Sequence, residues 1–240
     1  MRVQILILIL CIASLKSFSQ ERNYTLNIFT AKFNKNNLEV FDSTKKQVYQ
    51  KSFNNPSETL ADLDNDGVDE FLVTDSHKEG DADFYTLYIY NTIDSFYVAD
   101  SIQSGFMEPS ERNSDEFGGI IIVTGNYKFD YLNKDTDYNY LPVECWHYEN
   151  GKINSINDRI YNYFISENDT LTDVLDSYLQ SSTDDCKSLE KVKGVIASVY
   201  ANYMSAGEKI LANQFLKKYY RCNDLEIFRN KLNELLQEKL

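Results

Sequence analysis

The chain holds 240 residues, of which 37 are acidic and 24 are basic, so its formal net charge at pH 7 is −13. Such an acidic surface repels phosphate backbones, which argues against nucleic acid as a partner and favours cations or basic partners. The same charge would also keep an exported protein dispersed without any partner. The acidity is concentrated in one half: residues 21–157 carry 24 acidic and 11 basic side chains, whereas residues 158–240 carry 13 and 11.

The first twenty residues, MRVQILILILCIASLKSFSQ, have the pattern of a secretory signal peptide. Arg2 gives a basic start, an apolar run follows, and the small residues Ser17 and Ser19 precede an expected cleavage after Ser19. The run is shorter than the roughly 20 apolar residues of a membrane span. We therefore expect residues 1–19 to direct the chain to the periplasm or outside the cell, and no later membrane span.

Residues 20–157 are predicted to form an antiparallel β domain. Short segments rich in aromatic and β-branched residues are separated by Asn, Asp and Gly, which is typical of strands and turns. The expected strands are Thr25–Phe29, Leu38–Asp42, Phe71–Asp75, Phe84–Asn91, Ser95–Asp100, Gly119–Gly125 and a hairpin over Val143–Ile153. The Asn-Gly pair at Asn150 and Gly151 favours a two-residue turn in that hairpin.

A weak internal repeat runs through this β region. DEFLVTD (Asp69–Asp75) and GGIIIVTG (Gly118–Gly125) align about 50 residues apart, each followed by an aromatic strand, and Asn37–Lys46 ends an earlier partial copy. This period suits propeller blades of about four strands, although two or three blades cannot close a ring. A small sandwich or an open stack of blade-like sheets is the expected arrangement.

The segment DLDNDGVDE, Asp62–Glu70, predicts a cation site. Carboxylates on alternate residues repel one another unless a positive charge lies between them, and hard cations prefer several oxygen ligands. Gly67 permits the sharp turn that brings the ligands together. The expected ligands are side-chain oxygens of Asp62, Asp64, Asp66 and Glu70, the backbone carbonyl of Val68, and water. Asp side chains that cap backbone N–H groups without an ion are the alternative.

This loop begins like an EF-hand but departs from it, because Val73 stands where the bidentate Glu would be and a strand follows. DLDNDGVDEFLV instead resembles the calcium loops of FG-GAP or VCBS repeats, the integrin-α type of propeller blade. The resemblance covers about a dozen residues and implies Ca²⁺ bound by the same five residues. Glu111–Gly119 is a degenerate second copy, whose binding of an ion is left open. Asp75, Glu79, Asp81 and Asp83 either deepen the local negative field or form a solvated loop.

Residues 158–240 are predicted to form a helical domain, an antiparallel bundle or hairpin array with short loops. Helices are expected over Leu171–Ser181, N-capped by Thr170, and over Lys187–Met204. Two more are expected over Ser205–Tyr220, opened by a Ser205–Glu208 capping box, and over Asn223–Leu240. Ile210, Leu211, Phe215 and Leu216 are expected to face inward in the third.

Three cysteines follow the signal peptide. Cys186 precedes one predicted helix and Cys222 ends the next, so an antiparallel hairpin would place them side by side. An oxidising compartment permits a Cys186–Cys222 disulfide there, with three unpaired thiols as the alternative. Cys145 lies in an aromatic strand and is expected to be buried and inert.

The sequence predicts an α+β protein: an antiparallel region of propeller-blade-like repeats, then a helical bundle. Its two histidines, His77 and His147, form no zinc motif, and no nucleotide-binding or hydrolase-elbow glycine motif occurs. We expect an exported, calcium-binding, non-catalytic binding or adaptor module with an unknown protein or glycan partner. The alternative is a small secreted carbohydrate-active hydrolase with paired carboxylates in an aromatic cleft.

Overall fold

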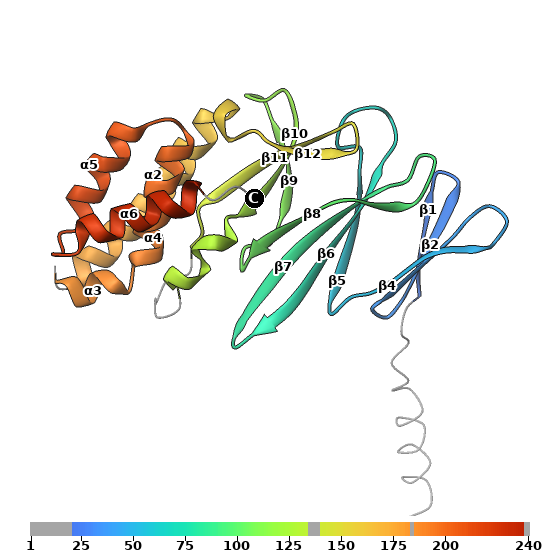
Figure 1. The fold of residues 1–240 in the computed structure, drawn as a ribbon, viewed down its shortest axis with the longest axis horizontal. Coiled ribbons are helices and arrows are strands. Elements are labelled where there is room, and N and C mark those ends of the chain that lie inside the picture. Colours follow the sequence, from blue (N-terminus) through green and yellow to red (C-terminus); the bar gives the residue numbers. More distant parts are fainter. Residues whose placement is uncertain (1–20, 134–139, 183–184, 238–240) are drawn as a thin grey trace, which may run out of the picture. The chain divides into compact units, whose positions relative to one another are not determined.

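The computed structural model describes residues 21–133, 140–182 and 185–237 (Figure 1). The predicted signal peptide lies outside these residues. The chain divides into two compact units, with the boundary between Phe53 and Asn54. The predicted boundary near residue 157 coincides with the change from strands to helices, but the helices belong to the same compact unit as two of the sheets.

The first unit contains one four-stranded antiparallel sheet, the first sheet, in the order β1-β2-β3-β4. Its strands are β1 Arg22–Leu26, β2 Phe29–Asn34, β3 Asn37–Phe41 and β4 Gln47–Ser52. Alternate residues of β2 and β3 are buried, as expected of strands with one covered face. The predicted strand over Thr25–Phe29 is wrong, because Asn27, at a φ of 49°, turns the chain between β1 and β2.

The second unit begins with the second sheet, in the order β5-β6-β7-β8. Its strands are β5 Pro56–Ala61, β6 Glu70–Glu79, β7 Ala82–Asn91 and β8 Tyr97–Gly105. The acidic loop joins β5 to β6, and Ala61 pairs with Glu70 where the ladder resumes. The loop is therefore held at its base by the two strands that it connects.

The third sheet has the same sequential connectivity, β9 to β12. Its strands are β9 Ser110–Ser114, β10 Gly119–Gly125, β11 Val143–Glu149 and β12 Lys152–Ser155. Asn150 and Gly151, with φ values of 53° and 75°, form the predicted turn between β11 and β12. The aligned repeat segments occupy equivalent places, since β6 and β10 are each the second strand of a four-stranded meander.

The second and third sheets pack face to face through one apolar cluster. Its buried members are Leu63, Leu72, Leu87, Ile89, Ile102, Ile122, Trp146 and Tyr148. The opposite face of the third sheet carries Ile121, Val123, Val143 and Cys145, which pack on Phe164 of helix α2 (Tyr161–Ser181). Figure 1 shows this order, with the third sheet between the second sheet and the helices.

Four more helices complete the second unit: α3 Cys186–Glu190, α4 Lys193–Ser205, α5 Lys209–Tyr219 and α6 Leu225–Gln237. Residues 194–202 of α4 are all buried, as expected of the central helix of a bundle. Two 3-10 helices, η1 (Tyr127–Asn133) and η2 (Asn157–Arg159), flank the third sheet. The Asn202 Oδ1 atom accepts a hydrogen bond of 3.1 Å from the Val143 backbone N–H and joins α4 to β11.

Several predicted helix starts are wrong. Helix α2 begins at Tyr161, nine residues before the predicted cap, so Thr170 is internal and its hydroxyl donates to the Ser166 carbonyl instead. Ser205 ends α4 and Glu208 precedes α5 without a side-chain cap, so the predicted capping box does not form. Ile210 and Leu211 are 72% and 39% exposed, contrary to their predicted inward orientation, whereas Phe215 and Leu216 are buried as predicted. In each case the apolar spacing correctly predicts a helix. The position of its first turn, or the face that is buried, differs from the prediction.

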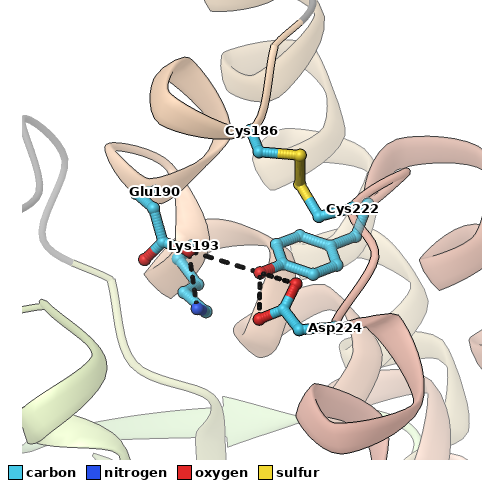
Figure 2. Close-up of polar contacts among 6 residues, drawn as sticks. Cys186, Glu190, Lys193, Cys222 and Asp224 are labelled. Carbon is cyan, nitrogen blue, oxygen red and sulfur yellow. Dashed lines mark hydrogen bonds and ion pairs between the residues drawn. A yellow bond between two sulfur atoms is a disulfide. The ribbon is translucent and has the colours of Figure 1, made fainter.

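Cys186 and Cys222 form the predicted disulfide, with 5.6 Å between their Cα atoms (Figure 2). Beside it, the buried Tyr220 hydroxyl lies 3.1 Å from both carboxylate oxygens of Asp224 and 3.3 Å from Glu190 Oε1. The Lys193 ammonium pairs with Glu190 Oε1 at 2.8 Å. The cross-link therefore lies next to a polar network that joins α3, α4 and the start of α6.

Candidate metal centre

Asp62 organises the acidic loop through backbone hydrogen bonds. Its Oδ1 atom accepts from the Asp66 N–H at 3.1 Å, and its Oδ2 atom accepts from the Gly67 N–H at 3.0 Å. Gly67 has a φ of 86°, in the left-handed region that favours glycine, and no atom crowds the place of a side chain there. The turn thus depends on backbone conformation at Gly67 and on the carboxylate of Asp62.

Glu70 is fixed at the base of the loop. It is the first residue of β6 and is 3% exposed, which is unusual for a carboxylate without a charged partner. Its Oε2 atom accepts a hydrogen bond of 3.0 Å from the backbone N–H of Leu63. Because Leu63 is anchored in the apolar cluster between the sheets, the position of the Glu70 carboxylate is defined by the core.

Three carboxylates converge at this loop. One oxygen each from Asp62, Asp64 and Glu70 can be chosen so that all three lie within 4.8 Å of one another. The Oδ1 atom of Asp64 is buried and has no hydrogen-bond partner. A buried acceptor without a donor is costly, and a bound cation would satisfy it.

The electrostatics agree with this geometry. Burial, followed by the charge of Asp66, raises the pKa of Asp64 above its ordinary value. Burial also raises the pKa of Glu70 to about 7, with the charges of Asp64 and Asp66 adding to it and the Leu63 N–H opposing it. Without a cation, these groups resist holding their charges together.

The structure brings together three of the five predicted ligands. Asp66 is exposed and lies outside the converging group; its Oδ1 atom accepts a hydrogen bond of 2.8 Å from the Val68 N–H. The roles of Asp66 and of the Val68 carbonyl as ligands stay predictions.

Tyr148 belongs to the surroundings of this site and was not found by sequence reasoning. It comes from β11 of the third sheet, is 1% exposed, and its buried hydroxyl makes no hydrogen bond of normal geometry. Burial, and next the charge of Glu70, raises the pKa of Tyr148 to about 12. Alternation along β11 places it on the face of Trp146, but only the packing of the two sheets shows that this face meets the loop.

The other acidic segments do not join the site. Among the described residues, the three-carboxylate grouping occurs at Asp62, Asp64 and Glu70 alone. Glu111 lies within β9 and is exposed. Asp75 pairs with Pro56 at the opposite end of the β5–β6 ladder, so the cluster from Asp75 to Asp83 lies away from the loop.

The histidines and the third cysteine are accounted for by packing. The His147 ring lies 4.6 Å from the Phe117 ring, and His77 Nε2 lies 3.2 Å from Glu79 Oε1. Cys145 is fully buried, as predicted, and burial raises the pKa of its thiol to about 12, which suppresses the reactive thiolate.

No family model, curated protein or solved structure matches this chain. Among the described residues, no helix combines the length and apolar composition needed to cross a bilayer.

Proposed function

We propose that this chain is an exported, calcium-binding module without catalytic activity, in which the ion stabilises the loop between two strands of a blade-like sheet. The observation that carries the proposal is the convergence of Asp62, Asp64 and Glu70 oxygens, together with the buried Oδ1 atom of Asp64 that has no hydrogen-bond partner. An all-oxygen, all-carboxylate donor set suits a hard divalent cation. Ca²⁺ is favoured because it accepts irregular geometry and six to eight oxygens, which water and the Val68 carbonyl would complete.

The sheet architecture supports the same proposal. The loop joins the first and second strands of a four-stranded meander, and the third sheet repeats that connectivity. This arrangement is compatible with open, blade-like FG-GAP or VCBS repeats and with the resemblance of the loop sequence. The exposed loops and the helical end are then the surfaces available to a protein or glycan partner.

Isothermal titration of the metal-depleted protein with Ca²⁺ and with Mg²⁺ tests the proposal. We expect one saturable Ca²⁺ site and weaker Mg²⁺ binding, because Mg²⁺ requires near-octahedral geometry and gives up its water reluctantly. Glu70→Gln removes a charge at nearly constant shape and should abolish the site. Asp69→Asn, an exposed loop residue outside the converging group, is the matched control and should bind like the wild type. Absence of saturable binding at millimolar Ca²⁺ would contradict the proposal.

The alternative, a carbohydrate-active hydrolase, requires two carboxylates across an aromatic cleft that is separate from the ion. A pocket lined by carboxylates and aromatic rings does exist at the other end of the β6–β7 hairpin. The three carboxylates of this pocket favour a cationic ligand over a neutral sugar.

A further inference from the structure

A pocket of about 750 Å³ lies between the end of the β6–β7 hairpin, Phe106 just after β8, and the short helix η1. Its volume is within the range of roughly 300–1,000 Å³ that is common for small-ligand sites. Three carboxylates line it: Glu79 and Asp81 from the hairpin and Asp130 from η1. We refer to it as the hairpin pocket.

Asp130 is the most constrained of these carboxylates. Its Oδ1 atom is buried and has no hydrogen-bond partner. A side chain at Gly105 would overlap this carboxylate, and Gly105 has a φ of 60°, so a glycine there makes room for it. Burial, and next the charge of Glu79, raises the pKa of Asp130 to about 7. The Oδ1 atom of Asp130 therefore lacks a donor, and the charge that acts on the Asp130 pKa after burial is that of the like-charged Glu79.

Aromatic rings form much of the remaining wall. Phe84 and Phe106 meet edge to face, with 6.4 Å between ring centroids and an interplanar angle of 89°. Tyr127 and Tyr131, both from η1, also line the pocket. Aromatic faces carry negative electrostatic potential and attract cations, most strongly where water is excluded.

Lys128 lines the hairpin pocket too, but the pKa of Asp130 stays raised in its presence, with burial and the charge of Glu79 as the causes. Lys128 also borders a smaller pocket that contains Glu144, and its charge acts to lower the pKa of Glu144. Asn133 is engaged within the protein, since its Nδ2 atom donates to the Phe129 carbonyl and its Oδ1 atom accepts from the Tyr140 N–H. Among the residues that line the hairpin pocket, three carboxylates thus stand against one cationic side chain, Lys128.

We propose that the hairpin pocket binds an organic cation of the arginine type, a guanidinium group on an apolar stem. The guanidinium group carries only donors and fits a carboxylate in two-point fashion, while its flat face and methylene stem suit aromatic walls. An inorganic cation gains little from the rings, and a neutral sugar leaves the charge of the three carboxylates uncompensated. The cation comes either from a free small molecule or from an arginine side chain in a peptide; these sources share one chemistry.

Isothermal titration tests this with the full protein held in millimolar Ca²⁺, so that the acidic loop is in one state throughout. The probes are N-acetylarginine amide, a short glycine peptide containing one arginine, and N-acetylcitrulline amide, a neutral isostere of the first. We expect saturable binding of both arginine probes and at least about tenfold weaker binding of the citrulline probe. A tenfold preference for the peptide would identify a peptide source, and equal affinities a small-molecule source.

Two variants make the test specific to the site. Asp130→Asn keeps the shape and removes the charge, so it should weaken arginine binding about tenfold or more. It should melt no lower than the wild type, because a buried charge is removed. Asp83→Asn is the matched control: Asp83 lies on the same hairpin but borders a different pocket, and its affinity for arginine should stay within about twofold.

Three results would overturn the proposal. They are no saturable binding of either arginine probe by the wild type, equal binding of the citrulline probe, and an Asp130→Asn variant that binds like the wild type. Binding of a neutral oligosaccharide in place of arginine would likewise refute it and favour the hydrolase. None of these results bears on Ca²⁺ at the loop, because Asp62, Asp64 and Glu70 do not line the hairpin pocket.

Discussion

The loops after β5 and after β9 occupy the same place in two sheets of the same topology, but they use their acids differently. In the second sheet, residues 62–69 separate the strands, and Glu70 is the buried residue at which β6 begins. In the third sheet, the shorter segment 115–118 connects the two strands, and Gly119 occupies the position that corresponds to Glu70. Gly67 and Gly118 keep nearly the same φ, 86° and 85°.

In the shorter loop, the carboxylate of Glu116 caps the start of helix α2. Both carboxylate oxygens of Glu116 accept from the Asn162 N–H, at 3.1 and 3.0 Å, in the first turn of α2. Ile160, the residue before α2, has no side chain that can cap it. A loop at this position therefore either gathers several carboxylates close together or offers one carboxylate to the helix that covers its sheet.

The largest expected effect tests how far the third sheet depends on α2. Phe164→Ala should lower the free energy of unfolding by about 3–5 kcal/mol, because Phe164 is fully buried against that sheet. Urea denaturation with and without Ca²⁺ measures it, and the loss should be the same in both. Tyr161→Ala, at a half-exposed site of the same helix, should cost much less. A similar loss for both variants would contradict this dependence.

The second effect tests the cation at the second sheet. With Ca²⁺ at 100 times its dissociation constant, we expect about 2.7 kcal/mol of added stability, removed by a chelator. Asp64→Ala should abolish this increment. It should not destabilise the metal-free protein, because it removes the repulsion between Asp64 and the neighbouring carboxylates. Calorimetric melting, with Asp69→Asn as the control, measures both. A melting temperature that ignores Ca²⁺ and chelator alike would contradict the site.

The third effect concerns Glu144, a half-buried carboxylate of the third sheet. Glu144 accepts a hydrogen bond of 2.9 Å from Asn126 Nδ2 and lies near Lys128, yet burial still raises its pKa to about 7. A raised pKa means that the stabilising protonated state is lost as pH rises from about 4.5 through 7, so stability falls over that window. In Glu144→Gln, the free energy of unfolding should therefore fall by about 2 kcal/mol less over this pH window than in the wild type.

Denaturant unfolding of Glu144→Gln at several pH values measures that difference. Glu149→Gln, an exposed position of the same strand, is the control and should leave the pH profile unchanged. Ca²⁺ should not alter the effect of Glu144→Gln, since Lys128 already provides a cation. An unchanged pH profile in Glu144→Gln would show that this carboxyl group titrates normally.

The smallest effect concerns the helix cap itself. Glu116→Ala should cost about 1 kcal/mol, the typical value of a lost N-terminal cap. Asp115→Ala, its exposed neighbour, should cost less than half of that. The measurement is again urea denaturation, and equal values for the two variants would mean that the contact with Asn162 adds nothing to stability.

Local sequence patterns predicted much of the β region because its strands pair with sequence neighbours. The predicted strand Gly119–Gly125 has the same bounds as β10. The turn at Asn150 and Gly151 was predictable because these residues tolerate positive φ. The Cys186–Cys222 disulfide followed from helix positions. The predicted start of helix α2 lies too far along the chain. The residue that caps this helix, Glu116, is distant in sequence and leaves no local signal.

The candidate site was predictable where the spacing of acids was informative, at Asp62, Asp64 and Glu70. It was not predictable where the third sheet contributes, since Tyr148 reaches the site only through sheet packing. The hairpin pocket shows the same limit: Asp130 and Glu79 are 51 positions apart in the chain, and no periodicity relates them.

The sequential order of the strands has a consequence for how the chain acquires its structure. Within each sheet every strand pairs with the strand next to it along the chain, so few distant segments must find one another. We therefore expect each meander to form soon after its last strand becomes available, and to do so from the amino end onward. The sheets would then form one after another along the chain, and the helices would pack last, on a third sheet that has already formed.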